Sequence, residues 1–177
     1  MTDLGAPLAE GDVRLDPLVE AHRDALRNAC GEDRDIWSLY PVSWGKAHFD
    51  AAFDALLARP ASHPFAIIQD GMLTGMTAFL GHQPERQTVE IGNSYVVPAA
   101  RGSGLNDRVK RLLLDRAFAF GIRRVEFRVD MRNARSLAAL AKLGAQREGV
   151  LRAERVTWTG HVRDAALFSI LAGEWGR

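Results

Sequence analysis

A short glycine-containing turn is the part of this sequence whose residue types point most clearly to chemistry. It lies between an apolar, strand-like segment and a long segment with helical periodicity. Glycine lets the backbone approach a ligand closely, and the unpaired amides at the start of a helix favour an anion. We therefore expect its main-chain amides to bind a phosphate group. The turn consists of Arg101, Gly102, Ser103, Gly104, Leu105 and Asn106.

The spacing of these glycines argues against two common nucleotide-binding motifs. The chain contains no Gly-x-x-x-x-Gly-Lys-Ser/Thr run, so we do not expect a P-loop NTPase. Asp107 stands where a Rossmann Gly-x-Gly-x-x-Gly motif needs its third glycine. A lone Gly-x-Gly pair also occurs in turns that only connect a strand to a helix. The neighbouring segments must therefore distinguish a phosphate-binding turn from a simple connection.

The turn resembles motif A of the GNAT acetyltransferases, Arg/Gln-x-x-Gly-x-Gly/Ala, which binds the pyrophosphate of acetyl-CoA. Arg101 and Gly104 match this motif, whereas Asn106 replaces its last glycine or alanine. Other segments are similar to the family in the same order. Residues 90–98 look like its fourth strand, residues 130–145 like its pantetheine-binding segment, and residues 147–170 like the closing hairpin of the RimJ/RimL-type N-terminal acetyltransferases.

The resemblance implies an α/β fold over a single domain of residues 1–177. This GNAT fold has a mostly antiparallel central sheet, a βαβ cofactor-binding unit and splayed fourth and fifth strands. Acetyl-CoA would be the acyl donor, and no metal is expected. Val96 and Val97 would then contact the acetyl carbonyl and the pantetheine, the turn amides would hold the pyrophosphate, and Asn133 would bind the pantetheine amide.

Acetyl transfer to an amine needs a neutral nucleophile, a stabilised oxyanion and a stabilised thiolate. Glu90 is the first candidate base and Glu154 the second, although a strand glutamate can also have no chemical role. Many GNAT enzymes place a tyrosine acid seven residues after the motif asparagine, where this chain has Leu140. Ser136 is then the candidate partner of the thiolate, unless it is only a helix-start serine.

The aromatic segment 36–44 is a candidate wall for the acceptor. Trp37, Tyr40 and Trp44 could line the groove, although such aromatics are also common as core beneath a loop. Nearby carboxylates at Glu32, Asp33 and Asp35 could attract a cationic amine. The expected reaction is direct attack by a primary amine, either a protein or peptide N-terminus or a small amine, in a ternary complex.

Two other functions stay open. The leucine at position 140 and the altered last motif position favour a catalytically weakened GNAT-fold acyl-CoA-binding protein. The charge is also uneven, with 7 Lys/Arg and 14 Asp/Glu in residues 1–100 but 16 and 8 in residues 101–177. A basic half can bind nucleic acid. No recognised reading motif accompanies it, so we expect no nucleic-acid partner.

The predicted elements form an antiparallel meander, then one βαβ unit, then a helix and a hairpin, which is a mixed α/β pattern. Strands are expected at 13–18, 65–68, 73–80, 88–97, 124–129, 149–158 and 162–171, and helices at 19–30, 46–59, 106–120 and 134–143. Helix 106–120 is expected to bury Val109, Leu112, Leu113, Ala117 and Phe120.

The bulk composition suits an ordinary globular domain, with 177 residues, 47% hydrophobic and 25% charged. Cys30 is the single cysteine, which excludes an internal disulfide, and the five histidines lack metal-ligand spacing. The N-terminus lacks signal-peptide features, and no apolar run is long enough to span a bilayer. We expect a cytoplasmic protein without a membrane partner. A homodimer is common for such folds and stays open.

Overall fold

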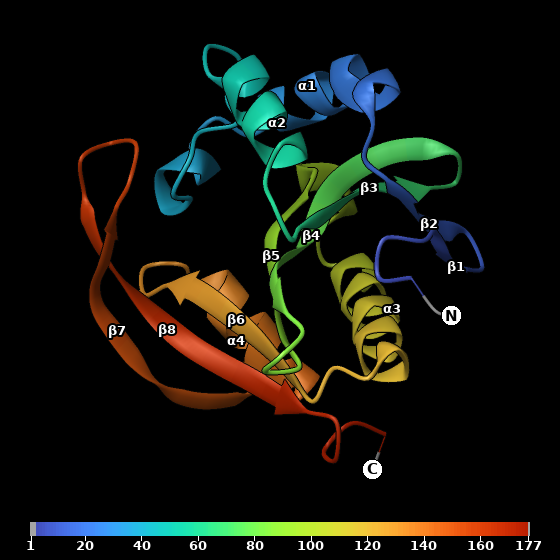
Figure 1. The fold of residues 1–177 in the computed structure, drawn as a ribbon. Helices are drawn as coiled ribbons and strands as arrows, with labels where there is room; N and C mark the ends of the chain where they lie inside the picture. Colours follow the sequence, from blue (N-terminus) through green and yellow to red (C-terminus); the bar gives the residue numbers. More distant parts are fainter. Residues whose placement is uncertain (1–2, 177) are drawn as a thin grey trace.

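A single eight-stranded sheet organises the computed structural model, which describes residues 3–176 (Figure 1). The strands are β1 (Leu8–Glu10), β2 (Val13–Pro17), β3 (His63–Gln69), β4 (Met72–Gln83), β5 (Thr88–Val96), β6 (Arg124–Asp130), β7 (Gln146–Val156) and β8 (Val162–Leu171). The α-helices are α1 (Arg23–Gly31), α2 (Phe49–Leu57), α3 (Leu105–Phe120) and α4 (Ala134–Leu143). Short 3-10 turns are η1 (Glu20–His22), η2 (Ile36–Leu39) and η3 (Pro98–Ala100).

The strand order is β1-β2-β3-β4-β5-β6-β8-β7, and β5–β6 is the one parallel pair among the described strands. Parallel neighbours need a crossover connection, which α3 provides. The parallel register joins residues 88–90 of β5 to residues 124–126 of β6, although β5 continues to Val96 and β6 to Asp130. The two strands therefore diverge beyond Glu90. This confirms the predicted GNAT fold with splayed strands.

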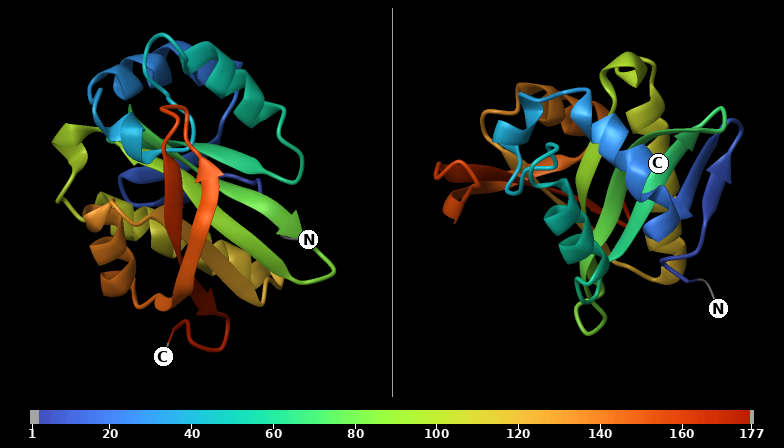
Figure 2. Two further views of the ribbon diagram at one scale, coloured as in Figure 1. Left: turned by 90° about the vertical axis from the view of Figure 1, so that its left-hand side faces the viewer. Right: turned by 90° about the horizontal axis from the view of Figure 1, so that it is seen from above.

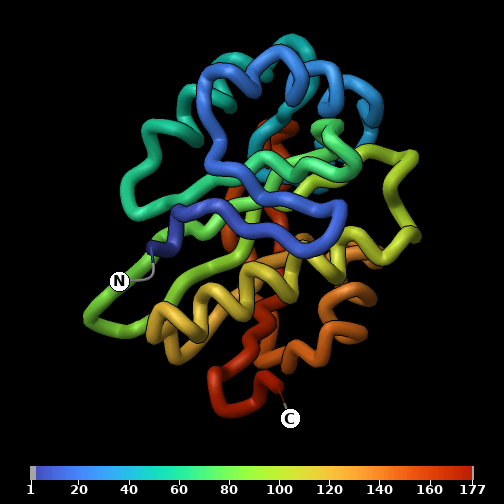
Figure 3. Tube along the Cα trace, turned by 90° about the vertical axis from the view of Figure 1, so that its right-hand side faces the viewer, coloured from blue at the N-terminus to red at the C-terminus, as the bar shows by residue number. Residues whose placement is uncertain are grey.

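Helices cover both faces of the sheet (Figure 2). On one face, α3 and α4 bury Val109, Leu113 and Leu140 against the strands. On the other face, α1, α2 and the 36–44 segment enclose Phe53 and Trp37 in a second apolar cluster. Figure 3 shows α3 running across the strands below the N-terminal hairpin. The sheet, including the part where β5 and β6 diverge, therefore lies between two packed layers, α3 with α4 on one face and α1, α2 and the 36–44 segment on the other.

Helix α3 presents a slightly different face from the predicted one. Val109, Leu113 and Ala117 are buried as expected, but Phe120 is 38% exposed. Lys110 is instead 6% exposed and packs on the inner side of the helix. The helical periodicity predicted the buried face of α3 to within one residue. The shift of that face brings the Lys110 side chain into the interior.

Two local features of the sheet were not predicted. The three-residue strand β1 extends the sheet by one strand beyond β2. In β5, the register with β4 shifts between Met76 and Ala78, and Asn93 adopts a left-handed backbone with φ of +52°. This β-bulge bends the strand at the point where it has left β6.

The β7–β8 hairpin projects from the sheet and reaches back to the 36–44 segment (Figure 1). Trp158, beyond β7, donates from its backbone amide to the Pro41 carbonyl (3.1 Å) and from its indole to the Trp37 carbonyl (2.7 Å). Arg132, at the end of β6, donates to the Ser38 carbonyl (3.0 Å). Three contacts distant in sequence thus hold this loop over the open end of the sheet.

Candidate active site

Two connected pockets lie where β5 and β6 diverge. The turn pocket, of about 230 Å³, runs beside the glycine turn, and the strand pocket, of about 320 Å³, runs along β5 and β6. Seven residues line both pockets, and we call this shared region the junction. They are Tyr40, Ser94, Asn106, Lys110, Ser136, Ala139 and Leu140.

The glycine turn has the backbone that an anion site requires. Gly102 and Gly104 have φ of +76° and +87°, a region that side chains with a Cβ rarely adopt. Ser103 fixes the turn, because its hydroxyl donates to the Ala100 carbonyl (2.7 Å) and accepts from the Leu105 amide (3.3 Å). The following amides open α3 and have no intrahelical acceptor. They are therefore available to a phosphate.

Arg101 connects this turn to the strand and to the segment before η2. It donates to the Val96 carbonyl (2.9 Å) and to the Asp33 carboxylate (2.6 Å). Burial alone would raise the pKa of Asp33, but the hydrogen bond from Arg101 brings it below its usual value. Asp33 is therefore committed to Arg101 and does not face a substrate amine, contrary to the expectation from the sequence.

The second terminal nitrogen of Arg101, Nη2, is buried and has no hydrogen-bond partner within residues 3–176. Buried polar groups are normally satisfied, and a guanidinium pairs most strongly with carboxylate or phosphate. This orphaned donor beside unpaired helix-start amides fits the diphosphate of a CoA thioester.

The backbone amides of the two valines at the end of β5 differ in whether they can donate to a thioester. The Val97 amide donates to the Thr74 carbonyl (2.9 Å), so it cannot also donate to a thioester as the sequence suggested. Backbone groups alternate in direction along an antiparallel strand. The Val96 amide therefore points away from β4 and into the gap left by β6.

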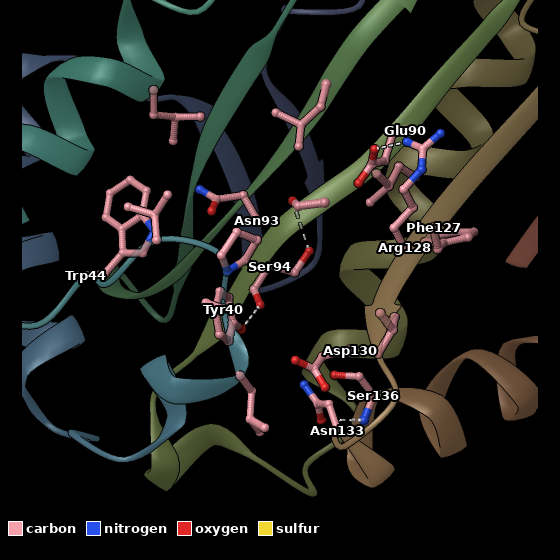
Figure 4. Close-up of a pocket in the computed structure, with 18 of the residues that line it drawn as sticks. Tyr40, Trp44, Glu90, Asn93, Ser94, Phe127, Arg128, Asp130, Asn133 and Ser136 are labelled. Carbon is pink, nitrogen blue, oxygen red and sulfur yellow. Dashed lines mark hydrogen bonds and ion pairs between the residues drawn. The ribbon is translucent and has the colours of Figure 1, made fainter. Parts of the chain in front are cut away.

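The bulge in β5 adds a polar group that the sequence interpretation missed. The Ser94 hydroxyl lies 2.8 Å from the Thr77 hydroxyl and is hydrogen-bonded to the Lys110 ammonium. The Ser94 carbonyl accepts from the Tyr40 hydroxyl. Figure 4 shows Tyr40 and Ser94 side by side, joined by this hydrogen bond. The Gly-Asn pair before Ser94, unusual inside a strand, is the signal that could have predicted the bulge.

Glu90 lies at the last parallel pair, where β5 and β6 separate, and lines the strand pocket. Its carboxylate is ion-paired with Arg128, as Figure 4 shows, and Arg128 also binds Glu126 (2.9 Å). The Glu90 carboxylate therefore lies where the two strands separate, held by an arginine that it shares with Glu126.

Glu154 is held differently. It lies on β7 between Arg155 (2.6 Å) and Arg163 (3.1 Å), and these arginines line the strand pocket. Burial raises the pKa of Glu154, but Arg155 and Arg163 more than offset this effect and lower it below its ordinary value. Glu154 itself lines neither pocket, whereas Glu90 lines the strand pocket, so the geometry favours Glu90.

The start of α4 supplies the opposite wall of the junction (Figure 4). The Asn133 side-chain carbonyl accepts from the Ser136 amide (3.1 Å) and so caps the helix. The Ser136 side chain lines both pockets. Leu140, one turn further, lines both as well, so an apolar group occupies the place of the usual tyrosine.

The aromatic segment contributes one residue to the junction. Tyr40 lies there, with burial raising the pKa of its hydroxyl. Trp37 is 1% exposed, and its indole donates to the Cys30 carbonyl (3.1 Å). The expectation that Trp37 lines the groove is therefore wrong, because it lies in the core and supports Tyr40 from behind. Trp44, in contrast, does line the strand pocket.

Other surfaces offer less chemistry. Three arginines of the basic half, Arg124, Arg128 and Arg132, are ion-paired with carboxylates. Among the described residues, no cluster of His, Cys, Asp and Glu has the arrangement of a metal site. The helices of residues 3–176 are all too short or too polar to cross a membrane.

Comparisons with known proteins identify the family of this mixed α/β chain. The profile of the acetyltransferase (GNAT) family matches residues 33–145. The chain therefore belongs to the GNAT acetyltransferase family, whose enzymes use acetyl-CoA. A search of proteins with curated function finds no match.

Solved structures reproduce the whole fold. A probable GNAT-family acetyltransferase from Chromobacterium violaceum is 30% identical over 98% of this chain and 89% of that one, with a TM-score of 0.90. A GCN5-related N-acetyltransferase from Brucella melitensis is 26% identical, covering 99% and 82%, with a TM-score of 0.90. RimJ from Mycobacterium smegmatis, in complex with CoA-disulfide, shares the fold at 23% identity, 98% and 90% coverage and a TM-score of 0.83.

Proposed function

We propose that this protein transfers an acetyl group from acetyl-CoA to a primary amine within a ternary complex. The observation that carries the proposal is the meeting of two pockets at one junction. One pocket is lined by the glycine turn and by Arg101, whose buried Nη2 has no partner among residues 3–176, and the other contains Glu90. A thioester bound in the first pocket would present its carbonyl to an amine that arrives from the second.

The residues take the following roles in this proposal. The Arg101 amide donates to the Pro98 carbonyl (3.1 Å) and the Leu105 amide to the Ser103 hydroxyl (3.3 Å), so not every amide of residues 101–106 is free as expected. The amides of residues 102–104 and 106 and the Arg101 side chain hold the diphosphate. The Val96 amide contacts the pantetheine or the acetyl carbonyl. Glu90 accepts the proton of the attacking amine, directly or through a water. The Ser136 hydroxyl stabilises the departing thiolate by a hydrogen bond, since a hydroxyl is too weak an acid to protonate it outright.

We further propose that the acceptor is a protein or peptide N-terminus, as in the RimJ/RimL-type branch. The support is the resemblance of residues 147–170 to that branch and the placement of the β7–β8 hairpin beside the strand pocket. A small amine is the other acceptor class. A single domain, a cytoplasmic location and a homodimer remain predictions from the sequence.

A catalytically weakened acyl-CoA-binding protein is a second candidate, which one observation favours. Leu140 places an apolar side chain at the junction where many family members have a tyrosine. Such a protein would keep the turn pocket and lose turnover.

Two measurements on the purified protein separate these functions. Acetyl-CoA should raise the melting temperature under both, because it binds only the folded state. Thiol release is then followed with peptides that have free N-termini, with small amines, and with the same peptides acetylated as controls. Release that requires a free amine supports the transferase. Binding without release supports the weakened protein, and absence of both contradicts the assignment of the cleft.

A further inference from the structure

Lys110 is a buried cation at the junction that the proposed roles leave unused. It extends from the inner face of α3, is 6% exposed and lines both pockets. Its ammonium is hydrogen-bonded to the Ser94 hydroxyl, which in turn contacts the buried Thr77 hydroxyl. A lysine, a serine on the bulge and a threonine thus form one chain of polar groups.

This lysine is costly for the folded state. Burying an ammonium without an anion is unfavourable, and burial lowers the pKa of Lys110 to about 7. Its buried neighbours on the helix, Val109, Leu113 and Leu114, are apolar, as stability alone would favour. Lys110 lies beside a cleft, at a buried position where stability alone would favour an apolar residue. A lysine at such a position indicates a functional group.

The protein itself supplies no anion for Lys110. Among residues 3–176, no carboxylate forms a salt bridge with it, and each carboxylate lining the two pockets is ion-paired with an arginine. The ionisable groups that line the two pockets with it are the acidic groups Tyr40, Glu90, Asp107 and Asp130 and the cations Arg59, Arg101, Arg128, Arg135, Lys142, Arg155 and Arg163. The negative charge that would pair with Lys110 must therefore come from a ligand or from a reacting group.

We propose that Lys110, in its ammonium form, is a catalytic residue that stabilises the negative charge on the carbonyl oxygen of the acyl donor during transfer. This inference rests on the proposed acetyltransferase function. Lys110 is bonded to Ser94 on β5, the strand whose Val96 amide faces the gap, whereas Ser136 lies on α4. Carbonyl oxygen and sulfur would thus be held from two different elements.

The step balances without another reactant. The lone pair of a neutral amine forms the new C–N bond, and the π electrons of the carbonyl move onto its oxygen, beside the Lys110 ammonium. When the C=O bond re-forms, the C–S bond breaks and the electron pair leaves with sulfur. The proton lost by the amine ends on the thiolate. Lys110 keeps its own proton throughout and acts by charge.

Lys110→Met tests this role, with Lys46→Met as the matched control, because Lys46 is exposed and lies outside both pockets. Methionine keeps the length of the side chain and removes the charge. We expect kcat to fall about 100-fold, as for loss of one oxyanion donor. Affinity for CoA should stay within about threefold, and the melting temperature should not fall, since an unpaired buried charge is removed.

The pH profile distinguishes an electrostatic role from a structural one. The ratio of the wild-type rate to the Lys110→Met rate cancels the titration of the acceptor amine. This ratio should be constant below pH about 7 and should decrease above it, because only the wild type loses an ammonium with a lowered pKa.

Three results would overturn the inference. An unchanged kcat in Lys110→Met would exclude a catalytic role, and a parallel loss of CoA affinity or of folding would indicate a structural one. A rate ratio that increases above pH about 7 would make Lys110 a base. If the wild type itself releases no thiol with any amine, the proposed function fails first, and this inference fails with it.

Discussion

The two pockets of the cleft are built in opposite ways. The turn pocket contains a stretch of exposed backbone, residues 96–106 with two glycines at positive φ and the start of α3, and residues of α4 line its other side. The strand pocket is made from side chains of the 36–44 segment, α2, β5, β6 and the β7–β8 hairpin. A site made of backbone tolerates changes in side chains, whereas a site made of side chains can change its acceptor while the fold stays the same.

This difference predicts that substitutions should separate into those that remove donor binding and those that remove turnover. Residues at the junction should affect both. The four tests that follow are ordered from the largest expected effect to the smallest.

Gly104→Val should have the largest effect, and it should act on the turn pocket. A β-branched residue cannot readily adopt φ of +87°, and the altered turn would lose several amide contacts to phosphate. We expect CoA affinity, measured by calorimetry, to fall about 1000-fold, or about 4 kcal/mol. Gly121→Val is the control, because Gly121 has φ of +98° at the other end of α3. Equal losses of affinity in both variants would mean that the turn does not bind the donor.

Glu90→Gln should act on the strand pocket alone. Removal of a general base typically costs about 100-fold in rate, so kcat should fall by about this factor while CoA affinity stays unchanged. Glu126→Gln is the control, since Glu126 shares Arg128 with Glu90 but does not line the strand pocket. A rate that survives in Glu90→Gln at every pH would assign the proton to Glu154 or to water.

Tyr40→Phe tests the junction. The Tyr40 hydroxyl donates a hydrogen bond to the Ser94 carbonyl. Loss of this bond should lower the free energy of unfolding by about 1 kcal/mol and kcat/KM about fivefold. Tyr95→Phe removes the equivalent bond to the Ala29 carbonyl (2.8 Å) within the core. The comparison between the pockets is supported if the melting temperatures of Tyr40→Phe and Tyr95→Phe fall by a similar amount while only Tyr40→Phe loses activity. Equal activity losses would indicate a general effect on stability.

Asp33→Asn should give the smallest effect. The Asp33–Arg101 pair lowers the pKa of Asp33, so its contribution to stability is present above the unfolded pKa of about 3.9 and is lost as pH falls through the lower folded value. The variant should therefore melt a few degrees below the wild type at pH 7, and the difference should shrink as the pH falls below the unfolded pKa of about 3.9. A difference independent of pH would contradict this assignment.

The sequence predicted the backbone-built half of the molecule well. Helix 134–143 has the predicted limits, and α3 begins one residue from its predicted start, because glycine and asparagine mark helix ends locally. The divergence of β5 and β6 followed from the resemblance to the GNAT family and not from any local pattern.

The side-chain half could be predicted only in part. Nothing local shows that Asp33 binds Arg101, since 68 positions separate them, or that Trp158 ties the hairpin to Trp37. Trp37 and Tyr40 lie three residues apart in one loop, yet one is core and the other lines the junction. Lys110 did leave a signal, because a charged residue interrupts the apolar stripe of α3.

The most direct test of the central claim is a titration of ¹⁵N-labelled protein with acetyl-CoA, followed by amide resonances. The account predicts that the largest shifts occur at residues 102–106 and at Val96, with the Thr88 to Glu90 amides, which lie in the paired part of the sheet, much less affected. A spectrum that does not change, or shifts confined to a distant surface, would contradict the claim that the glycine turn and the strand gap together form the thioester site.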